Sequence, residues 1–146
     1  VRQWLLFGHQ ITDRVRTQVR QEVLLGAGLD DLNRARVGGL NPYVVPLAGA
    51  PWASFLSDRH LALRWSWHFR LYKQLEAGVL GDLVWLADAA RTGASEDRAM
   101  AGVGLFADWQ LGAFQIDLAV GWCPTLRWHS SGGSLGALAS LGWQWG

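Results

Sequence analysis

The sequence predicts an all-β fold, an antiparallel meander of about seven strands within one domain spanning residues 1–146. Three observations support this prediction. Apolar and polar residues alternate without a break over residues 60–72. Half of all residues are apolar, yet no run of about 18 apolar residues occurs that could form a transmembrane helix. Short and long connections alternate between the expected strands, as they do in transmembrane barrels.

Residues 60–72 (HLALRWSWHFRLY) give the clearest strand signal. Successive side chains of a strand leave opposite faces, so one face is polar and basic and the other is apolar, with Leu61, Leu63, Trp65, Trp67, Phe69 and Leu71. Thirteen residues exceed the five or six of a usual soluble strand and match the roughly 9 to 11 tilted residues that cross a bilayer. The segment therefore indicates a transmembrane strand. A half-buried strand of a soluble β-sandwich is the alternative.

The residues before this strand predict two further strands and a long connection. Residues 2–12 are expected to form a strand whose facing the sequence leaves open, because residues 4–7 (WLLF) are all apolar. Residues 14–25 fit a helix, with valines every four residues after Asp13 as a possible N-cap, and also fit an alternating strand. We favour the strand because β-branched residues fill one of its faces. The connection of about residues 26–59 is rich in Gly, Pro and apolar residues, so it is expected to pack against the protein.

Four strands are predicted after residue 72. A tight turn at Lys73 and Gln74 leads into a strand at residues 75–86, and a polar loop at residues 87–97 leads into a strand at residues 99–110. A short turn at residues 111–113 precedes a strand at residues 114–122, and a loop at residues 123–133 precedes the last strand, at residues 134–145. All short turns then lie on one side of the sheet and all long loops on the other.

Aromatic residues are expected at both ends of the strands. The chain has ten tryptophans and eighteen glycines, a composition that suits a membrane barrel. If the chain ends on the periplasmic side, one aromatic girdle lies at the periplasmic rim and another at the outer rim. The first girdle comprises Trp109, Phe114, Trp143 and Trp145, and the second comprises Trp85 and Trp122.

The charged residues of the strands share the polar face. An arginine facing lipid at mid-membrane costs about 2 to 4 kcal/mol, so these residues must face the lumen. There they either pair with one another and hydrate the interior, or receive the long loop as a plug. The expected lumen residues are Arg16, Arg20, Arg64, His68, Arg70, Glu76, Asp82, Asp108 and Asp117.

Several functions are not expected. A net charge of +1 gives no reason to expect nucleic-acid binding. The single cysteine, Cys123, and four scattered histidines predict neither a disulfide nor a metal site, and no cofactor is expected. Ser54 or Ser66 with His60 or His68 is only a proximity in sequence, so no enzyme is predicted. Because the sequence begins at Val1, we expect a fragment or mature segment whose export signal lay upstream.

The order of these parts resembles the C-terminal barrel portion of the bacterial surface antigen family. The resemblance covers nearly the whole chain and depends on the order and spacing of its motifs. These are Arg36-Val37-Gly38-Gly39 before the loop tip, Gly81-Asp82 in the returning strand, residues 101–122 (AGVGLFADWQLGAFQIDLAVGW) and the aromatic-rich last strand. The family's barrels serve outer-membrane protein assembly and two-partner secretion.

The resemblance implies a sixteen-stranded barrel in the outer membrane of a Gram-negative bacterium, of which this chain supplies about seven strands. It implies that the loop, with Gly38, Gly39 and Tyr43, folds into the lumen and that Asp82 is the wall carboxylate it meets. The family's loop arginine is absent at Tyr43-Val44-Val45-Pro46, so the partner of Asp82 is expected to be either missing or replaced, with Arg34 or Arg36 as the replacement. The family usually ends on the final aromatic residue, whereas this chain continues to Gly146.

The implied function is insertion or translocation of proteins at the outer membrane. Expected partners are outer-membrane lipid, the remaining barrel strands, upstream domains and unfolded or nascent outer-membrane proteins. Substrate capture by polypeptide-transport-associated domains would be encoded upstream. A barrel of the same fold that serves as a membrane anchor or passive pore is the first alternative. A soluble β-sandwich or lipocalin-like binding module is the second.

Overall fold

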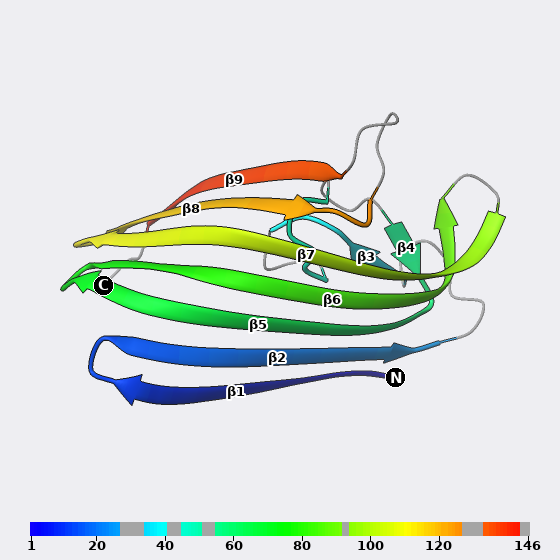
Figure 1. The fold of residues 1–146 in the computed structure, drawn as a ribbon, viewed down its shortest axis with the longest axis horizontal. Helices are drawn as coiled ribbons and strands as arrows, with labels where there is room; N and C mark the ends of the chain where they lie inside the picture. Colours follow the sequence, from blue (N-terminus) through cyan, green and yellow to red (C-terminus); the bar gives the residue numbers. More distant parts are fainter. Residues whose placement is uncertain (27–33, 41–44, 51–54, 92–93, 127–132, 144–146) are drawn as a thin grey trace.

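Seven long strands form one continuous antiparallel meander in the computed structural model, which describes residues 1–26, 34–40, 45–50, 55–91, 94–126 and 133–143. Neighbours in sequence are neighbours in the sheet, in the order β1-β2-β5-β6-β7-β8-β9 (Figure 1). The long strands are β1 (Arg2–Thr12), β2 (Val15–Leu25), β5 (Arg59–Tyr72), β6 (Leu75–Arg91), β7 (Ala94–Leu111), β8 (Phe114–Cys123) and β9 (Ser134–Trp143). The predicted all-β antiparallel meander is confirmed. Within the described residues the sheet does not close, and β1 and β9 are its two edges.

Two predicted segments are settled by the strand register. Residues 15–25 form β2, which pairs with β1 and with β5 along its whole length, so the helical interpretation is wrong. The facing of β1 follows from its pairing: Trp4 lies opposite Glu22 and Leu6 opposite Arg20, so these two apolar residues share the face of the charged ones. Phe7 lies opposite Val19 on the other face.

The prediction of a polar loop at residues 87–97 is wrong. β6 runs on to Arg91 and β7 begins at Ala94, so these two strands form a long hairpin. Ala89 pairs with Glu96 and Arg91 with Ala94, after an irregularity in the register between Leu86 and Ala89. A composition rich in Ala and charged residues indicated a loop, but backbone pairing with the partner strand outweighs this weak local propensity. The hairpin projects beyond the rest of the sheet (Figure 1).

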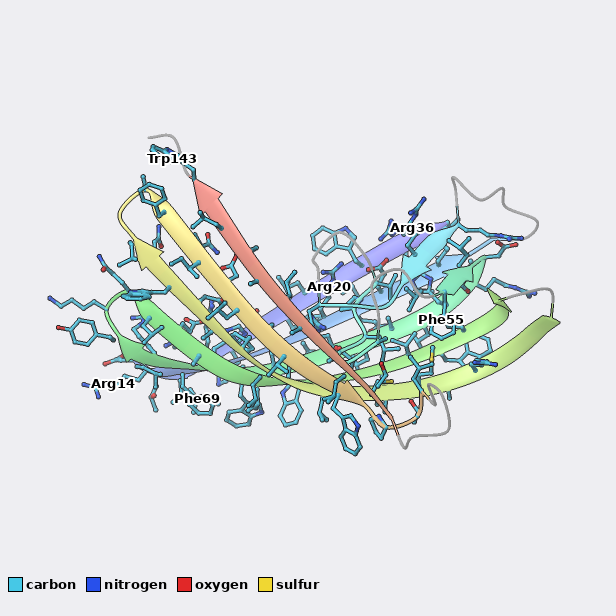
Figure 2. All side chains as sticks on the ribbon, turned by 90° about the horizontal axis from the view of Figure 1, so that it is seen from above. Arg14, Arg20, Arg36, Phe55, Phe69 and Trp143 are labelled. Atoms are coloured by element: carbon cyan, nitrogen blue, oxygen red, sulfur yellow. The ribbon has the colours of Figure 1, made fainter. Side chains whose placement is uncertain are left out.

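The sheet is curved into a trough with an apolar outer face. Figure 2 shows Phe69 on the convex side and Arg20 and Phe55 on the concave side. Large apolar side chains remain exposed along the convex face of every long strand, for example Phe7 at 65%, Leu83 at 58% and Leu118 at 50%. A monomeric soluble protein rarely exposes so extensive an apolar surface.

The long connection between β2 and β5 enters the trough. Its described residues, 34–40, 45–50 and 55–58, are called the inserted loop below. They include two short strands, β3 (Ala35–Val37) and β4 (Phe55–Ser57), which pair with each other; β4 also pairs with β6 through Leu56 and Ala90. The expectation that this connection packs against the protein is confirmed.

The principal buried core lies between the inserted loop and the inner surface of the sheet. Phe55, Val37 and Leu47 of the loop are at most 1% exposed. The same cluster includes these residues of the long strands: Leu24, Ala62, Val84, Leu86, Met100 and Cys123. Burying a side chain such as Leu or Phe contributes about 1.5 to 3 kcal/mol, so this cluster holds the loop in the trough.

Candidate functional site

Arg64 and Asp82 form a paired group on the wall of the trough. They lie directly opposite each other on β5 and β6. Arg64 Nε donates to Asp82 Oδ1 at 2.7 Å, and Arg64 Nη2 donates to Asp82 Oδ2 at 2.8 Å. The Asp82 side chain is fully buried and that of Arg64 is 18% exposed. Two parallel N–H donors on one carboxylate make a geometrically specific pair.

The inserted loop meets this pair through its main chain. The backbone N–H of Ala48 donates to Asp82 Oδ2 at 2.7 Å. The prediction that Asp82 lies on the wall where the loop docks therefore matches its position. The expectation that Arg34 or Arg36 is the partner of Asp82 is wrong. Arg34 Nε donates to Asp58 Oδ1 at 2.7 Å, and Arg36 points away from the core and is exposed.

Glycines on three strands leave a flat backbone surface, called the glycine floor below, against which the loop lies. Gly102 and Gly104 of β7, Gly121 of β8 and Gly136 of β9 approach the turn at residues 48–50. A Cβ atom placed on Gly121 would lie 2.6 Å from Gly49 N, and one placed on Gly102 would overlap Ala48 O. Only hydrogen in place of a side chain allows the two backbones to approach this closely.

Gly49 is required on the loop side of this contact. Its φ is +79°, in the left-handed region, and a Cβ there would overlap the backbone of Trp122 and Cys123. The abundance of glycine was visible in the sequence, but the role of Gly49 and of the glycines beneath it was not predicted. The signal was present as inward-facing glycines at Gly102, Gly104 and Gly121 on adjacent predicted strands.

The predicted loop motif, Gly38, Gly39 and Tyr43, precedes the turn at residues 48–50 that makes this contact. Gly38 and Gly39 have φ values of +119° and +95°, which favour glycine. Gly38 N donates to Val45 O at 3.0 Å, and the amide and carbonyl groups of Gly39 and Leu47 bond reciprocally at 3.2 and 3.1 Å. These bonds direct Val45 and Leu47 into the core. Tyr43, the third predicted motif residue, lies outside the described residues.

A second charged group lies nearer the short turns. Arg16 Nη2 donates to Glu76 Oε1 at 2.5 Å, and His68 Nδ1 contacts the same oxygen at 2.5 Å. His68 Nε2 in turn lies 2.9 Å from Ser66 Oγ. These residues come from β2, β5 and β6 and all face the trough. Arg70 lies opposite Glu76 and lines the end of the trough with Lys73 and Gln74 of the adjacent turn.

Asp108 and Asp117 lie opposite each other on β7 and β8, and Asp108 also lies opposite Glu76 on β6. Asp117 accepts hydrogen bonds from Gln115 Nε2 and Ser140 Oγ, both at 2.7 Å. The six predicted wall residues are thus found on one concave face, in two groups. Arg64 and Asp82 lie beneath the inserted loop, whereas the second group lies nearer the short turns and comprises His68, Arg70, Asp108 and Asp117.

Glu22 is a charged residue of this face that the sequence analysis did not single out. It is 2% exposed and forms ion pairs with Arg2 at 2.7 Å and with Arg20 at 3.1 Å. His60 Nε2 lies 3.5 Å from the same carboxylate. The sequence placed Glu22 in a strand, but only the register with β1 brings Arg2 beside it.

The described tryptophans of the predicted girdles lie on the convex face. Trp85, Trp109, Trp122 and Trp143 are 44%, 45%, 44% and 56% exposed, and Trp145 lies outside the described residues. Trp109 and Trp143 lie near the short turns, where the Phe114 and Trp143 rings meet edge to face at 4.5 Å. Trp85 lies opposite Ala99 and Trp122 opposite Val103, so these two are four positions apart in the register.

Among the described residues, no group of His, Cys, Asp and Glu side chains is placed to hold a metal ion. The same part of the chain contains no helix long and apolar enough to cross a membrane. Cys123 is buried beside the inserted loop, and its Sγ lies 3.5 Å from Thr125 Oγ1.

The described residues thus form a curved, seven-stranded antiparallel meander whose concave, charged face is partly covered by an inserted loop. Comparison of the chain with protein-family models, with curated proteins and with solved structures finds no match.

Proposed function

We propose that this chain is part of an outer-membrane β-barrel, plugged by its inserted loop, that acts in inserting or translocating proteins at the outer membrane. The observation that carries the proposal is the division of one sheet into two faces. The convex face exposes large apolar side chains on every long strand, whereas the charged side chains and the loop lie on the concave face. Lipid outside and a polar lumen inside require this division.

The free edges of the sheet support the barrel. β1 is exposed along its whole length, and an unpaired edge exposes backbone donors and acceptors that a membrane does not satisfy. The meander has an odd number of strands, so β1 and β9 run in the same direction. An all-antiparallel barrel therefore requires an odd number of further strands between these edges, and a sixteen-stranded barrel would take nine.

The loop inside the trough supports a transport role over simple anchoring. Its contacts combine an apolar core with one hydrogen bond from Ala48 to a buried carboxylate, so the trough has a defined closed state. Displacement of the loop would open a passage along the charged wall. The membrane anchor or passive pore is the second candidate, favoured by one observation: Asp82 is already neutralised by Arg64 of the wall, independently of any loop arginine.

The test uses the full-length protein in proteoliposomes, with a urea-unfolded outer-membrane barrel protein as substrate. We expect faster insertion of the substrate than in empty liposomes, measured by its folded migration on gels and protection from protease. Proteoliposomes containing an unrelated barrel protein are the control. Insertion no faster than in the control would contradict the transport role and leave the anchor or pore.

A further inference from the structure

Ser66, His68 and Glu76 form a hydrogen-bonded chain in the trough that the proposed function does not use. Ser66 Oγ lies 2.9 Å from His68 Nε2, and His68 Nδ1 lies 2.5 Å from Glu76 Oε1. The two ring nitrogens thus face different partners, a hydroxyl on one side and a carboxylate on the other. This is the order of contacts that activates a serine nucleophile through a histidine base.

The surroundings of His68 fix its ring. The edge of the Phe106 ring packs against it, with centroids 4.8 Å apart and planes at 62°. Phe106 lies opposite Gly78, where a Cβ atom would come within 2.7 Å of the Phe106 ring, so glycine is what allows this ring position. Arg16 Nη2 donates to the same oxygen, Glu76 Oε1, at 2.5 Å and lies 3.4 Å from His68 Nδ1.

Two contacts of His68 Nδ1 bear on the tautomer. Nδ1 lies 2.5 Å from Glu76 Oε1, which accepts, and 3.4 Å from Arg16 Nη2, which donates. We take the shorter contact as the hydrogen bond, so that Nδ1 carries the proton and the lone pair of Nε2 is directed at the Ser66 hydroxyl. A histidine that acts as a base for serine also needs a third group to orient its ring, and Glu76 is that group here.

The hydroxyl faces a cavity of about 620 Å³. Ser66 is 8% exposed and lines this cavity together with His68. Apolar side chains of the lining include Leu6, Leu80, Phe106 and Leu138, and polar ones include Gln18 and Arg20. Gln18 lies directly opposite Ser66 on β2 and lines the same cavity, so its side-chain amide is a candidate donor for an oxygen bound at Ser66.

We propose that Ser66, His68 and Glu76 form an esterase site for carboxylic esters with an apolar acyl chain. Ser66 Oγ attacks the ester carbonyl carbon while its proton passes to His68 Nε2, and the carbonyl oxygen becomes an oxyanion that accepts from Gln18. The C–O bond to the alcohol breaks, and the alcohol leaves with the proton from His68. Water then attacks the acyl-serine, giving its proton to His68, and the bond to Ser66 breaks to release the acid and restore the hydroxyl.

The test is covalent labelling of the purified full chain in detergent with a fluorophosphonate probe, together with hydrolysis of p-nitrophenyl octanoate. We expect labelling at Ser66, identified by peptide mass spectrometry, and loss of both labelling and hydrolysis in Ser66→Ala. The matched control is Ser134→Ala, because Ser134 is 8% exposed like Ser66 but lies at the start of β9, outside the lining of this cavity. This variant is expected to be labelled like the parent chain.

Two further variants separate a nucleophile from a polar network that only hydrates the trough. Gln18→Ala is expected to slow hydrolysis by about 100-fold, the effect of removing one oxyanion donor, with folding unchanged. Glu76→Gln is expected to reduce the labelling rate while circular dichroism shows the β-sheet retained. An unlabelled parent chain, or labelling equal in Ser66→Ala and the parent chain, would overturn the proposal.

Discussion

Arg64 and Asp82 face each other across β5 and β6 through two hydrogen bonds, and the main chain of Ala48 adds a third bond to the same carboxylate. A side chain of the wall thus fulfils the electrostatic role expected of a loop arginine. To this carboxylate the described part of the loop contributes a backbone N–H, so this contact depends on close approach and not on the charge of a loop residue.

Asp82→Asn is expected to loosen the inserted loop. The change leaves Arg64 without a countercharge in a largely buried position, which costs about 3 to 5 kcal/mol. It also weakens the bond from Ala48. We expect faster hydrogen exchange of residues 45–50 and faster tryptic cleavage after Arg36, both measured on the chain in detergent. Asp117→Asn is the control, since Asp117 lies away from the loop and bonds to Gln115 and Ser140; equal effects of the two variants would refute the role of Asp82.

Gly121→Val is expected to displace the turn at residues 48–50. A Cβ atom on Gly121 would lie 2.6 Å from Gly49 N and 2.8 Å from Ala48 Cβ, so the turn must move. Overpacking of this kind costs about 1 to 3 kcal/mol. The measurement is hydrogen exchange at the Ala48 amide. Gly81→Val is the matched control, because Gly81 lies on the convex face with open space around it. An Ala48 amide equally protected in the Gly121→Val variant would argue against the glycine floor.

Phe55→Ala is expected to release the loop by removing its largest buried side chain. Phe55 is 1% exposed within the cluster between loop and sheet, and such a truncation costs about 3 to 5 kcal/mol. When the chain is treated with a protease at increasing urea concentrations, we predict that the loop is half-cleaved at a lower urea concentration (the cleavage midpoint) in this variant. Phe7→Ala, at a position 65% exposed on the convex face, should leave this midpoint nearly unchanged. A midpoint lowered no more by Phe55→Ala than by Phe7→Ala would show that the loop core does not hold the loop.

The strands and their two faces could be predicted because both depend on local alternation. Residues 60–72 showed the pattern in full, and β5 follows it. The facing of β1 could not be predicted because residues 4–7 are all apolar, and only its pairing with β2 assigns Trp4 and Leu6 to the concave face. The prediction of a loop at residues 87–97 was wrong because the composition of this segment does not reveal that its residues pair in the β6–β7 hairpin.

The candidate sites depend on the register between strands, which alternation does not determine. The sequence placed Arg64 and Asp82 on one face, but a shift of two residues would preserve the facing and separate the pair. The same holds for Glu76, whose approach to His68 requires the turn at Lys73 and Gln74 to be tight. Gly49 was not predicted because its role depends on which strands lie beneath it.

In the proposed barrel the convex face of the sheet meets lipid and the concave face does not. Leu118 of β8 and Leu138 of β9 are a matched pair for testing this division. Leu118 pairs with Ala139 and Leu138 pairs with Ala119, so the two leucines lie at nearly the same level of adjacent strands but face opposite sides of the sheet. Membrane integration of Leu118→Arg and Leu138→Arg is to be compared by flotation with liposomes and resistance to carbonate extraction. We predict that Leu118→Arg reduces integration, in line with a cost of about 2 to 4 kcal/mol for arginine facing lipid, and that Leu138→Arg integrates like the parent chain. Equal integration of both variants, or a parent chain that stays monomeric in solution without detergent, would contradict the account.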